Sequence, residues 1–248
     1  MRLFVPVLAV LLVVSCQAAQ PDSSEEDVQL DGATFQGGQL VGALEKFKDI
    51  LKHGNQKLNI PILDPFRQAH MNIDLEAKKL FSVKGTLDDT RAVGLSNYKV
   101  NKGDFTLAGL KANVSLTWDD ISIMTKYNVK GTLVDSISFF GNGNLSAVLK
   151  GLTVTVDLKL SVKDKKLYVA DLVLHVHVKA LPCKITGLFD DEEMSNTVSQ
   201  IITETAPGIL DDYQNQISKY ASPKVAELMN NILKNFTLKD LMDLINGK

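Results

Sequence analysis

The chain has 248 residues, of which 45% are hydrophobic and 23% are charged. These values are typical of a folded globular protein and exclude a disordered chain, a collagen and a coiled-coil rod. The formal net charge is −2, so no excess of positive charge attracts a phosphate backbone, and we expect no nucleic acid partner. Two cysteines are too few for a disulfide-rich scaffold or for a zinc site built on cysteine.

The first residues form a predicted targeting segment. Arg2 precedes an apolar run over residues 3–14, and small residues follow up to Ala18. This order is typical of a secretory signal peptide, and the run is shorter than the ~20 apolar residues that a membrane span requires. We therefore predict a signal peptide over 1–18, with cleavage after Ala19 as the alternative.

The rest of the chain is predicted to be a secreted, extracellular protein. Residues 19–38 are acidic and contain no base, which favours a flexible lead. The folded domain is expected to cover residues 39–246. No segment of it is long and apolar enough to be a transmembrane helix.

In a secreted protein, sequons are candidate glycosylation sites and cysteines are candidates for disulfide bonds. Asn113, Asn144 and Asn235 each begin an Asn-x-Ser/Thr motif, so each is a candidate glycosylation site. Asn144 lies in the turn-like segment 141–144, which favours it. Loss of the signal peptide leaves Cys183 as the only cysteine, so we expect no internal disulfide. Cys183 is either buried and inert or pairs with another molecule.

The folded part is predicted to open with a helix. Its apolar residues are spaced four, three and four apart, which places them on one face. They are Leu40, Leu44, Phe47 and Leu51. Lys52 and His53 followed by Gly54 are typical of a helix C-terminus. The segment 60–66 contains two prolines and is expected to be an extended connector.

The middle of the chain alternates between apolar and polar residues. The alternation covers residues 71–77, 110–118, 152–162 and 170–178, and it predicts antiparallel strands with one buried face. Asn113 falls on the polar face. Residues 152–162 would span about 36 Å at ~3.3 Å per residue. Long antiparallel strands twist, so the sheet is expected to curl around whatever covers its apolar face.

The last third is predicted to be helical. Asp190 with Glu193 forms a capping-box-like start, and Pro207 is expected to interrupt the helix. A second helix over 208–233 would be about 39 Å long at ~1.5 Å per residue, with Pro223 as a kink or as a boundary between two helices.

Together these elements predict an α+β fold: a long C-terminal helix wrapped by a highly curved antiparallel sheet in a single domain. Such a pairing can enclose an apolar tunnel for a hydrophobic small molecule or lipid. The candidate ligand-binding residues come from the first helix, from the strands and from the C-terminal helix. They are Leu44, Phe47, Trp118, Val154, Val156, Leu158, Tyr213, Ile217 and Tyr220.

Catalytic and metal-binding patterns are missing from the sequence. We find no nucleophile elbow, phosphate loop, dinucleotide fingerprint or zinc-protease motif, so we expect no enzyme, no cofactor, no metal and no catalytic residue. His175 and His177 share one strand face but lack further metal ligands nearby in sequence, and we interpret them as solvated. A hydrolase that uses His175 or His177 is the weakest of the functional hypotheses. The acidic pairs are interpreted as turns and caps; they are Asp119-Asp120, Asp190-Asp191 and Asp211-Asp212.

Several short motifs, in this order, resemble the insect haemolymph juvenile-hormone-binding and Takeout-like family. The motifs are Ile60-Pro-Ile-Leu-Asp-Pro-Phe66, Val93-Gly-Leu-Ser-Asn-Tyr-Lys-Val100, Tyr127-Asn-Val-Lys-Gly131, Gly141-Asn-Gly143 and Leu188-Phe-Asp190. The resemblance implies the tubular lipid-binding fold, shared with the similar mite group 7 allergens. It also implies a carrier, in haemolymph or another body fluid, of juvenile hormone, another terpenoid or a lipid.

One departure from the family concerns cysteines. Typical members carry a cysteine pair near the mature N-terminus, whereas this chain has no cysteine from Ala19 to Pro182. The departure points to a divergent branch. The alternative function is a lipid-recognition or defence protein of the bactericidal/permeability-increasing type that binds microbial or membrane lipid, although the negative charge disfavours anionic lipid.

Overall fold

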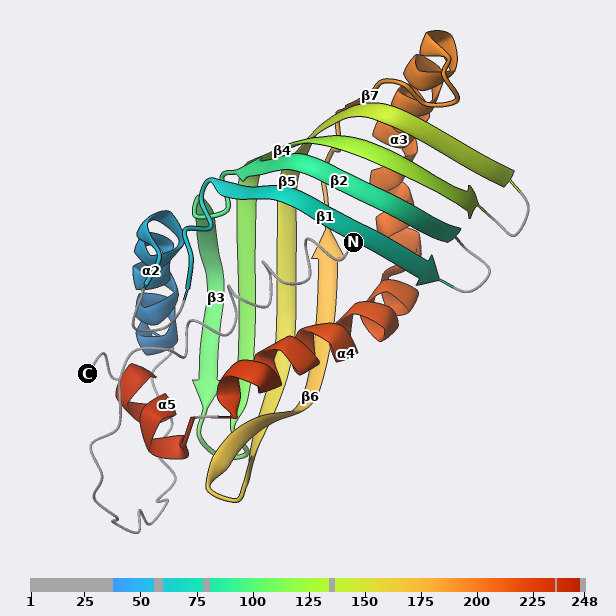
Figure 1. Ribbon diagram of the computed structural model, residues 1–248. Coiled ribbons are helices and arrows are strands. Elements are labelled where there is room, and N and C mark those ends of the chain that lie inside the picture. The colour runs from blue at the N-terminus through green and yellow to red at the C-terminus, as the bar shows by residue number, and fades with distance from the viewer. Residues whose placement is uncertain (1–37, 56–59, 78–80, 134–136, 235, 246–248) are drawn as a thin grey trace.

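The computed structural model describes residues 38–55, 60–77, 81–133, 137–234 and 236–245. The predicted signal peptide, nearly all of the predicted acidic lead and the Asn235 sequon lie outside these residues. The described residues form one large antiparallel sheet together with helices at both ends of the chain (Figure 1). The α+β class, with a curved sheet and a helical C-terminal part, is as predicted.

The chain runs from a helix through the sheet to three helices. The first helix, α2, spans Gly38–His53. The strands are β1 (Phe66–Ala77), β2 (Phe81–Val93), β3 (Tyr98–Thr106), β4 (Lys111–Leu133), β5 (Ile137–Lys163), β6 (Lys166–His177) and β7 (Cys183–Ile185). The C-terminal helices are α3 (Glu192–Asp212), α4 (Gln214–Leu233) and α5 (Leu238–Ile245).

The sheet is built around two long central strands. Its order is β1-β2-β4-β5-β6, with β3 also paired to β4 and β7 to β5, and every pairing is antiparallel. β4 has 23 residues and β5 has 27, so both extend far beyond the predicted strands. A tight turn at Asp164 and Lys165 joins β5 to β6, and both residues have positive φ.

A bend divides β4 and β5 into two halves. In β4 the buried side chains are even-numbered up to Trp118 and odd-numbered from Ile121 onward, with the exposed Asp119 and Asp120 between them. Gly151 of β5 lies opposite this point with a φ of 59°, a conformation that glycine adopts at little cost. The pair Asp119-Asp120 therefore lies on exposed positions within a strand and forms neither the turn nor the cap that was predicted for it. Asp119 accepts from Lys99 Nζ at 2.7 Å.

We name the two halves separately. The core sheet comprises β3, β6 and the parts of β4 and β5 at residues 111–118 and 152–163. The distal sheet comprises β1, β2 and the remainder of β4 and β5. Figure 1 shows the distal sheet bending over, with α4 running below it across β6. Because β4 and β5 continue through the bend, the core sheet and the distal sheet form one continuous, curved sheet.

The core lies between the core sheet and the helices that cover it. Leu40, Leu44, Phe47 and Leu51 of α2 are all buried, as the helical spacing predicts. α2 packs against β3, where a Cβ on Gly103 would come within 2.9 Å of Val41 Cγ2. Glycine at this position therefore allows the helix to approach the strand closely.

The C-terminal helices differ from the prediction in two respects. Pro207 lies inside α3, and the interruption falls instead at Tyr213, where the chain turns from α3 into α4 (Figure 1). The N-cap of α3 is Asp191, whose side chain accepts from Met194 N at 2.9 Å, and not Asp190. The reason is local: Asp190 has a φ of 54°, which is incompatible with the extended backbone of a capping residue.

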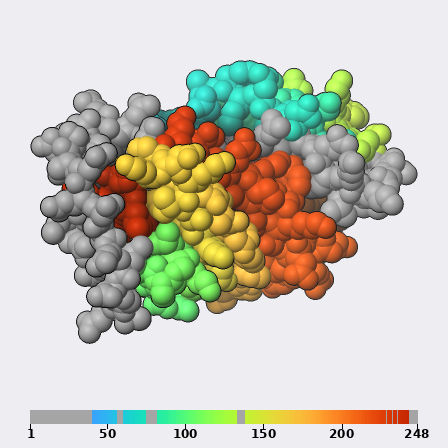
Figure 2. Space-filling model, turned by 90° about the horizontal axis from the view of Figure 1, so that it is seen from below, coloured from blue at the N-terminus to red at the C-terminus, as the bar shows by residue number. Residues whose placement is uncertain are grey.

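Polar side chains of α4 close the outer edge of β6. Gln214, Ser222 and Asn230 accept hydrogen bonds from the backbone amides of Val176, Leu174 and Val169, at 3.1, 3.2 and 2.7 Å. Figure 2 shows the β5–β6 hairpin lying beside α4 when the molecule is seen from below. An edge strand presents unpaired backbone groups, and here the helix satisfies three of them.

The hydroxyl groups of α3 likewise accept hydrogen bonds from backbone amides of the segment that contains β7. Ser195, Ser199 and Thr203 are spaced four apart and accept from the amides of Leu188, Ile185 and Cys183 at 2.9, 2.9 and 3.0 Å. Ser195 and Ser199 are buried. The spacing places the three hydroxyls on one face of the helix. These hydrogen bonds fix α3 to the segment that contains β7, which in turn pairs with β5 of the distal sheet.

Candidate functional site

An apolar face runs across the first strands of the distal sheet. Met71 lies opposite Leu87, which lies opposite Tyr127, and in the next row Ile73, Gly85 and Val129 are aligned. Directly opposite residues in antiparallel strands share a face, as do residues two apart along a strand. We name this surface the distal apolar face; it consists of Met71, Ile73, Val83, Leu87 and Val129.

The distal apolar face is turned toward the inside of the curved wall. Tyr127, which shares the face, is buried and donates its hydroxyl to the carbonyl of Thr186 at 2.9 Å. Thr186 lies between β7 and α3, so the same face looks toward the C-terminal helices. Burial also raises the pKa of the Tyr127 hydroxyl above its ordinary value, so it remains a hydrogen-bond donor near neutral pH.

The five residues of the distal apolar face are half-buried. None of them belongs to the hydrophobic core cluster or to the partly buried side chains packed against that cluster. Among the described residues, β1 makes extensive contact with β2 alone, and β2 with β1 and β4. Within the part of the chain that the structure describes, the distal apolar face therefore has no helix packed on it as the core sheet has, and it retains apolar area that an occupant could bury.

Glycines on this face let aromatic rings lie close to the sheet. A Cβ on Gly141 would lie 2.8 Å from the hydroxyl of Tyr127, and one on Gly131 would lie 2.8 Å from the ring of Phe139. A Cβ on Gly143 would lie 1.9 Å from the carbonyl of Thr186. The run 141–144 was predicted to be a turn but lies inside β5, because these glycines serve close packing and not chain reversal.

Five of the predicted ligand-binding residues lie together in the closed core. Leu44, Phe47, Trp118, Val154 and Val156 are each at most 3% exposed. A side chain without accessible surface has neighbours on every side, so a ligand could reach these residues only if the core opened. Their role as ligand contacts stays a prediction.

The other four predicted residues are more accessible. Leu158 is half-buried and packs against the core cluster. Ile217 and Tyr220 on α4 are half-buried, and Tyr213 at the junction of α3 and α4 is 41% exposed. The fold therefore does not bring all nine predicted residues to one surface.

The polar atoms of three aromatic side chains, Trp118, Tyr220 and Tyr98, have partners. Trp118 donates its indole N–H to the carbonyl of Leu95 at 2.9 Å. Tyr220 accepts from Lys224 Nζ at 2.5 Å, and the same ammonium lies 3.8 Å from the ring centroid, a cation–π contact. Tyr98 was not singled out from the sequence, yet it is buried and donates to the carbonyl of Leu44 at 2.5 Å. These bonds tie β3 and β4 to their neighbours and occupy the aromatic polar groups.

Sequence reasoning missed most of the distal apolar face. Met71 and Ile73 were assigned to a strand but not to a site, and Val83, Leu87 and Val129 were not singled out. The available signal was the alternation of Val83, Gly85 and Leu87, in which a glycine replaces the middle apolar residue. A glycine inside a strand interrupts the apolar–polar alternation. Gly85 interrupts it in β2, so the apolar face of this strand was not recognised from the sequence.

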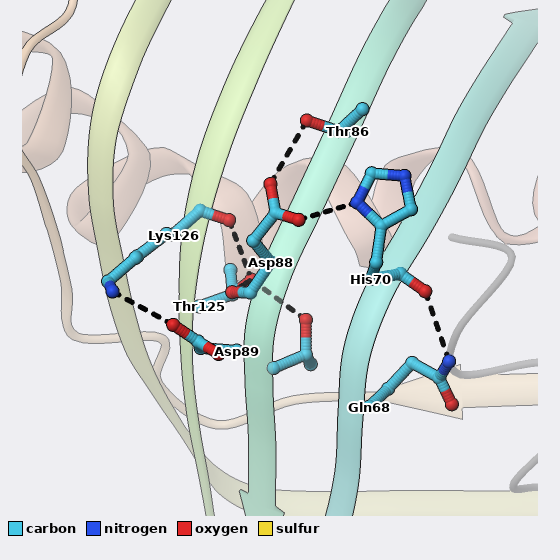
Figure 3. Close-up of polar contacts among 8 residues, drawn as sticks. Gln68, His70, Thr86, Asp88, Asp89, Thr125 and Lys126 are labelled. Carbon is cyan, nitrogen blue, oxygen red and sulfur yellow. Dashed lines mark hydrogen bonds and ion pairs between the residues drawn. The ribbon is translucent and has the colours of Figure 1, made fainter.

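The opposite face of the distal sheet is polar (Figure 3). His70 Nδ1 lies 2.5 Å from Asp88 Oδ1, and Lys126 Nζ lies 2.8 Å from Asp89 Oδ2. The hydrogen bond to His70, and then that to Thr86, hold the pKa of the Asp88 carboxyl below its usual value despite an opposing contribution from burial. This network joins β1, β2 and β4 across the surface.

The remaining candidate residues lie at the surface or half-buried. His175 and His177 are exposed, and His177 Nδ1 lies 2.8 Å from Asp211 Oδ1. Within the described part of the chain, no group of three or more His, Cys, Asp and Glu side chains is placed to hold a metal ion. Cys183 is half-buried, with Sγ 3.5 Å from the carbonyl of Ser199, and burial raises the pKa of its thiol.

Two of the sequons can be placed. Asn144 is exposed on β5. Asn113 is half-buried on β4, and its amide donates to the carboxylate of Asp157 on the neighbouring strand. Glycosylation of either residue stays a prediction.

Comparison with known proteins identifies the family. The family model for haemolymph juvenile hormone binding protein matches residues 8–243. The chain belongs to this family. No curated protein sequence matches the chain. Among the helices of the described residues, none has the length and apolar character needed to cross a membrane.

Three solved structures were compared with the chain, and one of them supports the fold. Takeout 1 from Epiphyas postvittana is 14% identical, with a TM-score of 0.57, and the match covers 81% of this chain and 94% of that one. Lipopolysaccharide binding protein is 18% identical with a TM-score of 0.31, over 84% of this chain and 39% of that one. Latherin is 19% identical with a TM-score of 0.26, over 84% and 78%. The Takeout 1 match agrees with the curved sheet and C-terminal helices described above.

Proposed function

We propose that the protein is a non-enzymatic carrier that holds a small hydrophobic ligand of the terpenoid or lipid class against the distal apolar face. The observation that carries this proposal is the set of half-buried apolar residues on β1, β2 and β4 that stand outside the packed core. Membership of a family named for juvenile hormone binding supports a ligand of this class.

Affinity in this proposal comes mainly from burial. Each Å² of apolar area removed from water contributes about 25 cal/mol, and the face spans two aligned rows on three strands. The closed core supplies little further surface, because its side chains are already packed. The ligand therefore lies between the distal sheet and the C-terminal helices, beside the core and not within it.

Secretion is part of the proposal. The basic residue and apolar run at the start of the chain would direct export, and the exposed Asn144 would carry a glycan. N-terminal sequencing of material collected outside producing insect cells should begin at Ala19 or Gln20. Enzymatic removal of N-glycans should shift its mass, and Asn144→Gln should reduce that shift. Asn113→Gln should change it less, since Asn113 is engaged with Asp157.

Ligand binding is tested with displacement of a fluorescent apolar probe by a terpenoid such as farnesol. Native mass spectrometry of the secreted protein should first show a co-purified apolar molecule. Met71→Asn and Leu87→Asn, which change two opposite residues of the distal apolar face, should weaken probe binding about tenfold or more, as expected when apolar contacts worth ~1.4 kcal/mol are lost.

The matched control is Val173→Asn, which introduces the same amide at a valine on β6 that is 36% exposed. This variant should bind the probe as the unchanged protein does. Equal affinity in all three variants would contradict the proposed location. Failure of the unchanged protein to bind any apolar probe would contradict the carrier function itself.

A further inference from the structure

A recess lies on the polar face of the distal sheet, opposite the distal apolar face. Its volume is about 500 Å³, within the range of ~300–1,000 Å³ that is common for small-molecule sites. Its side chains come from β2, β4 and β5 and form two adjacent rows. One row is Thr86, Asn128 and Asn142, and the other is Lys84, Lys130 and Phe140.

Two lysines stand side by side in the lining of this recess. Lys84 and Lys130 are directly opposite on β2 and β4, and like charges in this position destabilise a sheet. Lys84 Nζ lies 3.4 Å from Asp74 Oδ2, which offsets one charge. Within the described residues, Lys130 has no carboxylate at ion-pair distance. An anion placed between the two ammonium groups would relieve this repulsion.

Neutral donors and an aromatic ring surround the two charges. The amides of Asn128 and Asn142 stand in the row next to the lysines, and each can donate two hydrogen bonds and accept others. Phe140 is 50% exposed, and its ring is held edge-on by Phe189 at a centroid distance of 5.6 Å. An exposed, fixed ring beside amides suits the apolar face of a sugar.

Asp190 completes the lining at the side of β5. Phe189 and Asp190 have φ values of 56° and 54°, which are uncommon for residues other than glycine. The amide of Phe189 donates to the carbonyl of Phe140 at 2.9 Å and holds this turn in place. The exposed carboxylate of Asp190 accepts hydrogen bonds only, as a sugar hydroxyl requires.

We propose that this recess binds a phosphorylated sugar, with the phosphate between Lys84 and Lys130 and the hydroxyls on Asn128, Asn142 and Asp190. The ligand is either a free sugar phosphate or the same group at the head of a lipid. The site is distinct from the distal apolar face, because its side chains point to the other side of the same strands.

The experiment titrates glucose 6-phosphate, inorganic phosphate and glucose into ¹⁵N-labelled protein at constant ionic strength. Glucose 6-phosphate should give saturable shifts at the amides of Lys84, Asn128, Lys130 and Asn142, and glucose alone should bind at least tenfold more weakly. Lys130→Gln should weaken glucose 6-phosphate binding about tenfold or more. Since this change also removes a like-charge pair, the variant should remain folded and at least as stable as the unchanged protein without ligand.

The matched control is Lys99→Gln, which removes an exposed lysine on β3 far from the recess and should leave binding unchanged. Vesicles of a neutral lipid, with and without a lipid bearing a sugar phosphate, distinguish the sources: binding to the second vesicles that soluble glucose 6-phosphate displaces identifies a lipid head group. The proposal is overturned if Lys130→Gln and Lys99→Gln reduce binding equally, or if the shifts map outside the recess. Because the apolar probe does not use these residues, Lys130→Gln should bind it normally.

Discussion

Asn230 on α4 accepts a hydrogen bond from the backbone amide of Val169 on β6, with 2.7 Å between Oδ1 and N. Ser222 and Gln214 make the equivalent bonds to Leu174 and Val176. These acceptors are eight residues apart along the chain, so one helix side chain reaches the strand about every two turns. The contact fixes the position of α4 along β6, and thereby the position of the helices relative to the distal apolar face.

Replacing this acceptor should destabilise the protein. Asn230→Leu leaves the amide of Val169 without its partner, and an unsatisfied buried donor costs about 1–3 kcal/mol. We expect a lower urea midpoint with little change in the slope of the transition. Asn231→Leu, at the exposed neighbouring position, should have a much smaller effect. Equal midpoints for the two variants would show that the bond contributes nothing to stability.

Two glycine-to-alanine changes should have effects of opposite sign. At Gly141 the new Cβ would lie 2.8 Å from Tyr127 Oη and 3.0 Å from the carbonyl of Gly187, and overpacking of this kind costs about 1–3 kcal/mol. At Gly208, inside α3, nothing lies within 4 Å of the new Cβ. Alanine there should stabilise the helix by about 0.5–1 kcal/mol.

Thermal unfolding of the two alanine variants provides the measurement. Gly141→Ala should lower Tm, and Gly208→Ala should raise it. The first variant should also weaken apolar probe binding, because Tyr127 shares the face with the distal apolar residues. A Gly141→Ala protein with unchanged Tm and unchanged probe affinity would contradict the packing described for β5.

The parts of the fold that the sequence predicts are those with an uninterrupted period. The α2 spacing corresponds to a buried face, and so does the alternation from Leu152 to Leu160, whereas Val162 at its end is exposed. Where a glycine falls on the apolar face, as at Gly85 and Gly141, the alternation is lost and the strand was missed or taken for a turn. A single sequence does not distinguish a glycine that allows close packing against a strand from a glycine that allows the chain to turn.

The candidate site was only partly predictable for a related reason. Hydrophobic periodicity identifies faces that are buried, but it does not tell which buried face is packed and which is left open. Trp118 and Leu87 both lie on apolar faces; α2 and the core sheet enclose the first, whereas the second lies on a part of the sheet that bends away at Gly151. The bend depends on tertiary packing, so it could not be read from local sequence.

The hydrogen bond between His70 and Asp88 should make stability depend on pH in the acid range. The His70 hydrogen bond is the largest cause that lowers the pKa of Asp88 in the folded protein. A carboxyl group whose pKa is lowered on folding stabilises the protein above its unfolded-state pKa of about 3.9, and this contribution is lost as the pH falls through the folded-state value. The stability difference between the unchanged protein and Asp88→Asn should therefore be largest above about pH 4 and shrink below it.

Denaturation at a series of pH values measures this difference, and NMR titration of the Asp88 carboxyl carbon measures the pKa directly. In His70→Ala the pKa of Asp88 should rise toward its ordinary value, because the hydrogen bond with the largest effect is gone, while Thr86 and Lys126 remain. Replacing Lys126 by Gln should raise the same pKa by less. If His70→Ala left the Asp88 titration unchanged, the bond across β1 and β2 would not be formed in solution, and the polar network in Figure 3 would join only β2 and β4.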